Sequence, residues 1–105
     1  MFTVIGTGTY TKEIDKLPKD YREAADKIPP KLAANPFIGD QLGYPFLRER
    51  RIKEKRVYYL IYDDLKLVLL VAVSGKKDQQ RTINHIKQQL DEYRKVAEEV
   101  AKQVS

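Results

Sequence analysis

The chain has 105 residues, 42% of them hydrophobic, which is enough for one compact domain over residues 1–105 and too little for two. Lys and Arg number 20 against 15 Asp and Glu, so the chain leans basic at +5 while both signs remain abundant. With no cysteine and one histidine, disulfides, thiolate metal sites and cysteine nucleophiles are excluded. We therefore expect neither a metal nor another cofactor.

The N-terminal residues MFTVIGTGTY lack a basic stretch followed by a long apolar run, as a secretory signal would have. No segment approaches the length of apolar sequence needed to span a bilayer. The sequence therefore predicts a cytoplasmic protein that does not enter a membrane.

A short strand and two helices are expected in the first third of the chain. Phe2 to Ile5 is apolar and β-branched, and Thr9 can cap the first helix. Pro18 favours the first turn of a second helix, while Pro29 and Pro30 predict that this helix ends or kinks just before them. The apolar residues recur at the spacing of one buried helical face: Tyr10, Ile14, Leu17, Tyr21, Ile28 and Leu32.

The middle of the chain indicates an antiparallel meander. After an irregular connection from Phe37 to Pro45, candidate strands cover Phe46 to Ile52, Arg56 to Tyr62 and Lys66 to Val73, and Asp63-Asp64 marks a tight turn before the last of them. The third run, LKLVLLVAV, is almost continuously apolar. This pattern predicts a central strand that is covered on both faces.

One long C-terminal helix is predicted for residues 79–104, with apolar residues at steps of three and four. The seam consists of Ile83, Ile86, Leu90, Tyr93, Ala97, Val100 and Val104. It either packs on the rest of the domain or stays partly open for a partner helix, including a second copy of the chain in a homodimer.

A dense cluster of basic residues runs into an aromatic and β-branched strand in the segment LRERRIKEKRVYYLIY, residues 47–62. Basic side chains on a strand form a rigid cationic surface, which suits a polyanion because neutralised phosphates release counterions. Tyr58, Tyr59 and Tyr62 could stack on bases, although alternating tyrosines more often pack in a sheet. Nucleic acid is the first partner that this segment indicates.

The order of the elements, together with several local strings, resembles the RelE/ParE superfamily of bacterial and archaeal toxins over roughly residues 2 to 83. The strings are YTKEIDKLP, LAANP, RIKEKRVYYLIYDD and LVLLVAV, the last followed by the basic turn SGKK. The resemblance implies an α+β fold, with an N-terminal strand and helical hairpin packed on a small antiparallel sheet. It also implies a toxin that cleaves ribosome-bound messenger RNA without a metal and is neutralised by a cognate antitoxin.

The resemblance also assigns site residues. Arg56 and Arg51 match two arginines of the family pattern, so Arg56 is expected to clamp a phosphate in the transition state and Arg51 to position the substrate. The ribose 2′-hydroxyl attacks the neighbouring phosphorus, which requires a proton acceptor, charge stabilisation and a proton donor. The further catalytic candidates are Lys53, Lys55 and Lys77, and the further RNA-binding candidates are Arg48, Arg50, Lys76 and Arg81.

Departures from the family pattern leave alternatives open. The family lysines fall on Leu47 and Glu49, and the aromatic residue expected after the basic turn is absent from residues 79–83. His85 lies nearby, but it is displaced on the helix and is more simply interpreted as a surface residue. The first alternative is a non-catalytic inhibitor of DNA gyrase, like the ParE branch. The second is a degenerate toxin that only binds nucleic acid or antitoxin.

Overall fold

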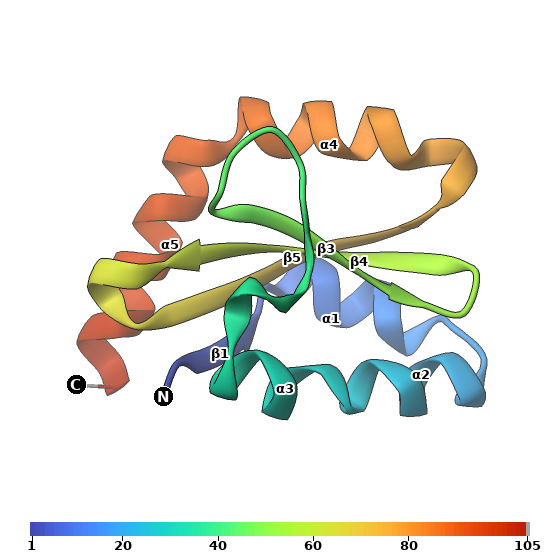
Figure 1. Ribbon diagram of the computed structural model, residues 1–105, viewed down its shortest axis with the longest axis horizontal. Coiled ribbons are helices and arrows are strands. Elements are labelled where there is room, and N and C mark those ends of the chain that lie inside the picture. The colour runs from blue at the N-terminus through green and yellow to red at the C-terminus, as the bar shows by residue number, and fades with distance from the viewer. Residues whose placement is uncertain (105) are drawn as a thin grey trace.

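The computed structural model describes residues 1–104, which form a five-stranded sheet with helices on both faces (Figure 1). The helices are α1 (Gly8–Asp15), α2 (Lys19–Asp26), α3 (Ile28–Ala34), α4 (Gln79–Gln88) and α5 (Leu90–Val104). The first three pack on one face of the sheet and the last two on the other. The α+β prediction is confirmed.

The sheet is mixed rather than purely antiparallel. Its strands are β1 (Thr3–Gly6), β2 (Asp40–Gln41), β3 (Leu47–Ile52), β4 (Lys55–Tyr62) and β5 (Leu67–Gly75), in the order β1-β5-β4-β3-β2. Strands β3, β4 and β5 form the predicted antiparallel meander. Strand β1, however, pairs in parallel with β5. Parallel neighbours need a long connection, and the chain between these two strands includes three helices and the rest of the meander.

The N-terminal helical region contains three helices instead of the predicted two. The cap of α1 is Thr7, not Thr9, because the Thr7 hydroxyl accepts a hydrogen bond from the Tyr10 amide at 3.1 Å. Pro18 precedes the first turn of α2 as expected. The break before Pro29 and Pro30 also follows the prediction, since α2 ends at Asp26 and α3 begins at Ile28.

The C-terminal region differs from the prediction of one continuous helix over residues 79–104. Gln89 leaves helical geometry, with φ −110° and ψ 14°, and separates α4 from α5. The break lets α4 run along the sheet while α5 turns down across its end (Figure 1). The predicted seam does pack on the sheet, from Ile83 to Val100, so most of it is core.

Two apolar clusters hold the layers together, one on each face of the sheet. Tyr58 and Tyr59 are fully buried, one in each cluster, so they pack in the core and do not offer rings to nucleic acid. The Tyr59 hydroxyl donates to the Pro36 carbonyl at 2.7 Å and accepts from the Gly39 amide at 3.0 Å. Gly39 comes so close to Tyr59 that a side chain there would collide with the ring hydroxyl.

None of the helices described over residues 1–104 combines the length and the apolar character that crossing a bilayer requires.

Candidate nucleic-acid interface

The β3–β4 hairpin aligns the two arginines of the family pattern. Ile52 pairs with Lys55, so only two residues form the turn, and Arg51 then lies directly opposite Arg56. Lys53 makes this turn with a left-handed backbone, φ 52°. On its other side Arg56 pairs with Ser74, near the end of β5. The strand pairing therefore places residues from three strands at one end of the sheet.

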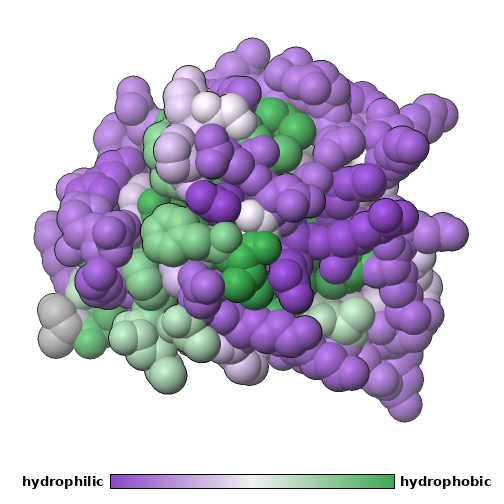
Figure 2. All heavy atoms as spheres, in the orientation of Figure 1, coloured by the Kyte–Doolittle hydropathy of each residue, from purple (hydrophilic) through white to green (hydrophobic). Residues whose placement is uncertain are grey.

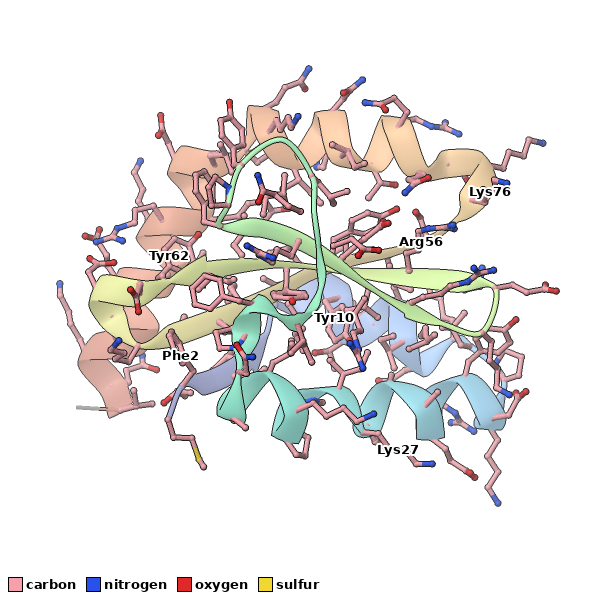
Figure 3. The ribbon with its side chains drawn as sticks, viewed as in Figure 1. Phe2, Tyr10, Lys27, Arg56, Tyr62 and Lys76 are labelled. Carbon is pink, nitrogen blue, oxygen red and sulfur yellow. The ribbon has the colours of Figure 1, made fainter. Side chains whose placement is uncertain are left out.

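A groove of about 430 Å³ opens at this end of the sheet, between the hairpin, α2 and the turn after β5. Five cationic side chains line it: Arg51, Lys55, Arg56, Lys76 and Lys77. Tyr21 of α2 supplies an aromatic ring, and Glu54 is the one acidic residue in the lining. Figure 3 shows Arg56 and Lys76 at this end, where β5 leads towards α4. Such a concentration of positive charge attracts an anion.

Arg56 is the least exposed of the basic side chains for which an ion pair is found over residues 1–104, at 13%. Its Nε lies 3.6 Å from Oε1 of Glu49, whose side chain is 11% exposed. The Gln79 amide donates to both oxygens of Glu49, at 3.2 and 2.9 Å. The Nη1 atom of Arg56 is buried and has no hydrogen-bond partner among the described residues. A buried donor without an acceptor lowers the stability of the fold, so a further acceptor for Nη1 of Arg56 would be favourable.

A tyrosine–serine contact lies beside this ion pair. The hydroxyls of Tyr58 and Ser74 are 2.9 Å apart. Burial raises the pKa of Tyr58, while the hydrogen bond with Ser74 and the charge of Arg56 oppose that rise. Tyr58 therefore stays a neutral phenol at physiological pH and supports the site without taking a proton from a substrate.

The other predicted site residues lie outside the groove. Lys53 lies at the tip of the hairpin, with its Nζ 3.5 Å from Asp20 of α2. Arg81 is engaged by Asp78 one turn earlier in the chain. Arg50 lines a neighbouring hollow of about 220 Å³ that shares Arg51 with the groove. The candidate residues thus divide into a central group and a surrounding group.

Arg48 has a structural role in this arrangement. Its Nη1 donates to the Phe37 carbonyl at 3.1 Å and to the Gly39 carbonyl at 3.0 Å, and its Nε donates to the Pro45 carbonyl at 2.8 Å. The guanidinium also lies 5.2 Å from the centre of the Phe37 ring. These contacts hold the loop before β3 in place and occupy the Nε and Nη1 donors of Arg48.

Sequence reasoning missed two residues of the site, Glu49 and Tyr21. The signal for Glu49 was present, because residues two apart on a strand share a face and Glu49 is two before Arg51. Tyr21 falls at the spacing of the buried helical face, so the sequence does not distinguish it from a core residue. Leu47, at the other family lysine position, is fully buried in the core.

Over residues 1–104 no group of three or more acidic or histidine side chains is placed to hold a metal ion. His85 is exposed on α4 and does not line the groove.

Comparison with known proteins gives a consistent picture at the level of the fold. No protein-family model matches the chain, and no curated protein matches it significantly. Solved structures do match. The intact E. coli RelBE toxin–antitoxin complex aligns with TM-score 0.64 and 20% identity, covering 71% of this chain and 96% of that one. A free, arginine-substituted mutant of the E. coli toxin RelE aligns with TM-score 0.70 and 19% identity, covering 83% and 96%.

A third match is the RelBE2 toxin–antitoxin complex of Mycobacterium tuberculosis, with TM-score 0.63 and 24% identity, covering 71% of this chain and 98% of that one. The fold is that of a small α+β toxin. More specifically, the chain has the RelE-like toxin fold, as the sequence resemblance predicts.

Proposed function

We propose that this protein is the toxin of a toxin–antitoxin pair and that it inhibits translation by cutting ribosome-bound messenger RNA. The observation that carries the proposal is the groove, which is lined by five cationic side chains, one of them Arg56, whose buried Nη1 has no hydrogen-bond partner within residues 1–104. A phosphate would supply the missing acceptor and neutralise the excess charge. The RelE-like fold supports the same conclusion.

The reaction needs no metal in this proposal. The ribose 2′-oxygen attacks the adjacent phosphorus, the bond from phosphorus to the 5′-oxygen breaks, and a 2′,3′-cyclic phosphate and a 5′-hydroxyl result. Arg56 stabilises the added negative charge on the phosphoryl oxygens. In this proposal Lys55 and Lys77, which line the groove, exchange the protons, while Arg51 and Lys76 hold the flanking part of the RNA strand. Lys53 acts from the hairpin tip, and Arg50 and Arg81 extend the cationic surface.

The proposed partners are a cognate antitoxin, the ribosome and messenger RNA, all in the cytoplasm. An antitoxin is supported by two of the three solved structures described above, which are toxin–antitoxin complexes. A homodimer through the C-terminal helices stays a prediction. Most of their seam packs on the sheet, and Val96 and Val104, 42% and 55% exposed, are the large apolar side chains left exposed in the described part of these helices.

The test is a translation reaction to which the purified protein is added, followed by mapping of message ends by primer extension. We expect new ends within codons in the decoding site for the wild type, none for Arg56→Ala, and unchanged cutting for Lys95→Ala, which removes an exposed cation from α5. Intact message with the folded wild-type protein would overturn the proposal.

One observation favours the non-catalytic alternative, inhibition of DNA gyrase. Ile83, where the resemblance leads one to expect an aromatic residue, is buried in the core with 7% exposure. Among the residues that line the groove, none is an aromatic residue of α4, and the aromatic ring comes from Tyr21 of α2 instead. A supercoiling assay separates the two functions, since a gyrase inhibitor would block supercoiling and leave translated messages intact. RNA binding that weakens with salt but leads to no cleavage would indicate a degenerate toxin.

A further inference from the structure

A second and larger hollow, of about 630 Å³, adjoins the cationic groove. The two share Lys55 and Gly75, which pair across β4 and β5. The second hollow forms because β1 pairs only with Leu67 to Leu70, so residues 71–74 of β5 have no neighbouring strand on that side. Helices α1 and α4 flank this open edge of β5, and Tyr93 of α5 contributes to the lining.

The chemistry of this second hollow differs from that of the groove. Its acidic and basic side chains nearly balance, because Glu13 and Asp78 offset Lys55 and Arg81, and Asp78 already engages Arg81. The remaining polar lining consists of groups that donate or accept neutral hydrogen bonds, together with one imidazole: Thr9, Ser74, Thr82 and His85. Such a lining does not select for a phosphate.

The hollow also has apolar and aromatic surface. Val71, Ala72 and Val73 line it along β5, and the half-buried ring of Tyr93 lies beside them. Glu13 is close enough to Tyr93 to affect the pKa of its phenol, which burial and the Glu13 charge both raise. Apolar and aromatic side chains with hydrogen-bonding groups around them suit a planar heterocycle whose edge carries donors and acceptors.

We propose that this hollow is a nucleobase subsite, which receives the base of a nucleotide whose phosphate lies in the cationic groove. The inference rests on the proposed function, because it requires an RNA strand in the groove. At Lys55 and Gly75 the bound RNA strand passes from phosphate contacts in the groove to base contacts in the hollow. Within the subsite, Thr82 and His85 contact the base from α4 and Glu13 contacts it from α1.

Binding of short RNA tests the subsite. The probe is a hexamer with 2′-fluoro riboses, which cannot be cut, and a matched series in which one position at a time is abasic. We expect one position at which loss of the base weakens binding about fivefold or more, the order of effect of one lost base contact. The penalty should shrink in Thr82→Val and His85→Ala, and it should persist in Asn84→Ala, a neighbour on α4 outside the hollow.

The single histidine provides a second readout, since the His85 ring signals stand alone in the proton NMR spectrum. We expect the intact hexamer to shift them and the hexamer lacking the critical base to leave them nearly unmoved. An abasic penalty that is equal in all the variants, or no position-specific penalty, would overturn the subsite while the groove stands. Failure of the intact hexamer to bind at all would overturn both, and binding without message cleavage would overturn only the proposed nuclease.

Discussion

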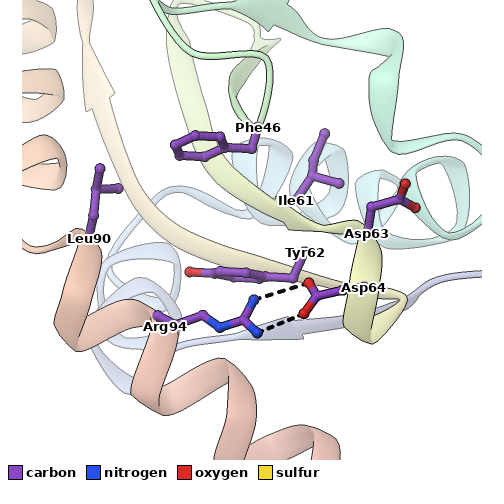
Figure 4. Close-up of a pocket in the computed structure, with 7 residues that line it drawn as sticks. All are labelled: Phe46, Ile61, Tyr62, Asp63, Asp64, Leu90 and Arg94. Atoms are coloured by element: carbon purple, nitrogen blue, oxygen red, sulfur yellow. Dashed lines mark hydrogen bonds and ion pairs between the residues drawn. The ribbon is translucent and has the colours of Figure 1, made fainter.

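The two ends of the sheet differ in whether their charged side chains are paired. At the end away from the hairpin, the two carboxylates after β4 both have cationic partners. Asp63 accepts from Lys66 at 2.8 Å, and Asp64 makes paired hydrogen bonds with Arg94 at 3.0 and 2.7 Å beside a hollow of about 340 Å³ (Figure 4). At the hairpin end, five cations share one groove, and Arg56 is the one for which an ion pair is found within residues 1–104.

Under the proposed function, the difference separates charges that neutralise one another from charges that are available to a phosphate. Surface pairs such as that of Asp64 and Arg94 contribute little to stability but leave no net field. Clustered like charges repel one another and lower stability, so a folded domain tolerates them where a ligand neutralises them. Figure 2 shows hydrophilic side chains over most of one face, including its right edge, with apolar patches among them, chiefly from the lower left to the centre.

Substituting Arg56 should have the largest effect on activity of the changes predicted for the two ends. We expect Arg56→Ala to lower the rate of message cleavage about 100- to 1,000-fold, because it removes preorganised stabilisation of the phosphoryl charge. Rates should be measured by primer extension, with circular dichroism to verify folding. Arg56→Lys should recover part of the rate, since it restores the charge without the planar donors. Loss of activity only in proportion to lost folded protein would contradict a catalytic role.

Removing one groove cation should change how RNA binding responds to salt. We expect Lys77→Ala to reduce the slope of log affinity against log salt by about 0.7, the contribution of one contact to a single-stranded phosphate. The control is Lys95→Ala at a paired position, where Nζ lies 3.4 Å from Glu92. Fluorescence anisotropy with labelled RNA at several salt concentrations measures both, and equal slopes for the two variants would contradict the comparison.

Removing the negative charge beside Arg56 should act in the opposite direction. We expect Glu49→Gln to raise RNA affinity about fivefold, equivalent to ~1 kcal/mol, because the carboxylate competes with phosphate for Arg56. The amide can still meet Gln79, so the fold should survive. Glu54→Gln, in the groove but exposed, should give a smaller increase. Weaker RNA binding by Glu49→Gln would mean that the carboxylate orients Arg56 and does not compete for it.

The paired end should show the smallest effect, and only in its pH dependence. Arg94 holds the pKa of Asp64 below its usual value, chiefly through their hydrogen bonds. A depressed pKa in the folded state contributes stability that is present above the unfolded pKa and is lost as the pH falls through the folded pKa. Arg94→Gln should therefore lower the melting temperature by a few degrees at most at pH 7, and the two proteins should converge in acid. A pH-independent difference in thermal melts would contradict this.

Local sequence patterns predicted most of the helices and strands. The runs of residues 46–52 and 56–62 predicted β3 and β4, whereas the opposition of Arg51 and Arg56 is a finding of the structure. The parallel pairing of β1, by contrast, depends on contacts far apart in the sequence. The break at Gln89 could not be predicted because no proline or glycine marks it. It is set by how α4 and α5 each pack on the sheet.

The candidate site was predicted only in part, for a similar reason. Five cations meet in the groove because the turn between β3 and β4 and the turn after β5 lie at the same end of the sheet. They are Arg51, Lys55, Arg56, Lys76 and Lys77. The role of Arg48 depends on where the carbonyls of Phe37 and Gly39 lie, and no spacing in the sequence reports that. The contact of Glu49 with Gln79 joins residues thirty positions apart.

The most direct test of the central claim compares two messages in a translation reaction with the wild-type protein. One is all ribose, and the other carries a single 2′-deoxynucleotide at the mapped cleavage position. The account predicts cleavage of the ribose message to a 2′,3′-cyclic phosphate and a 5′-hydroxyl, and no cleavage of the deoxy message at that position. Equal cleavage of the two messages, or cleavage of neither, would contradict it.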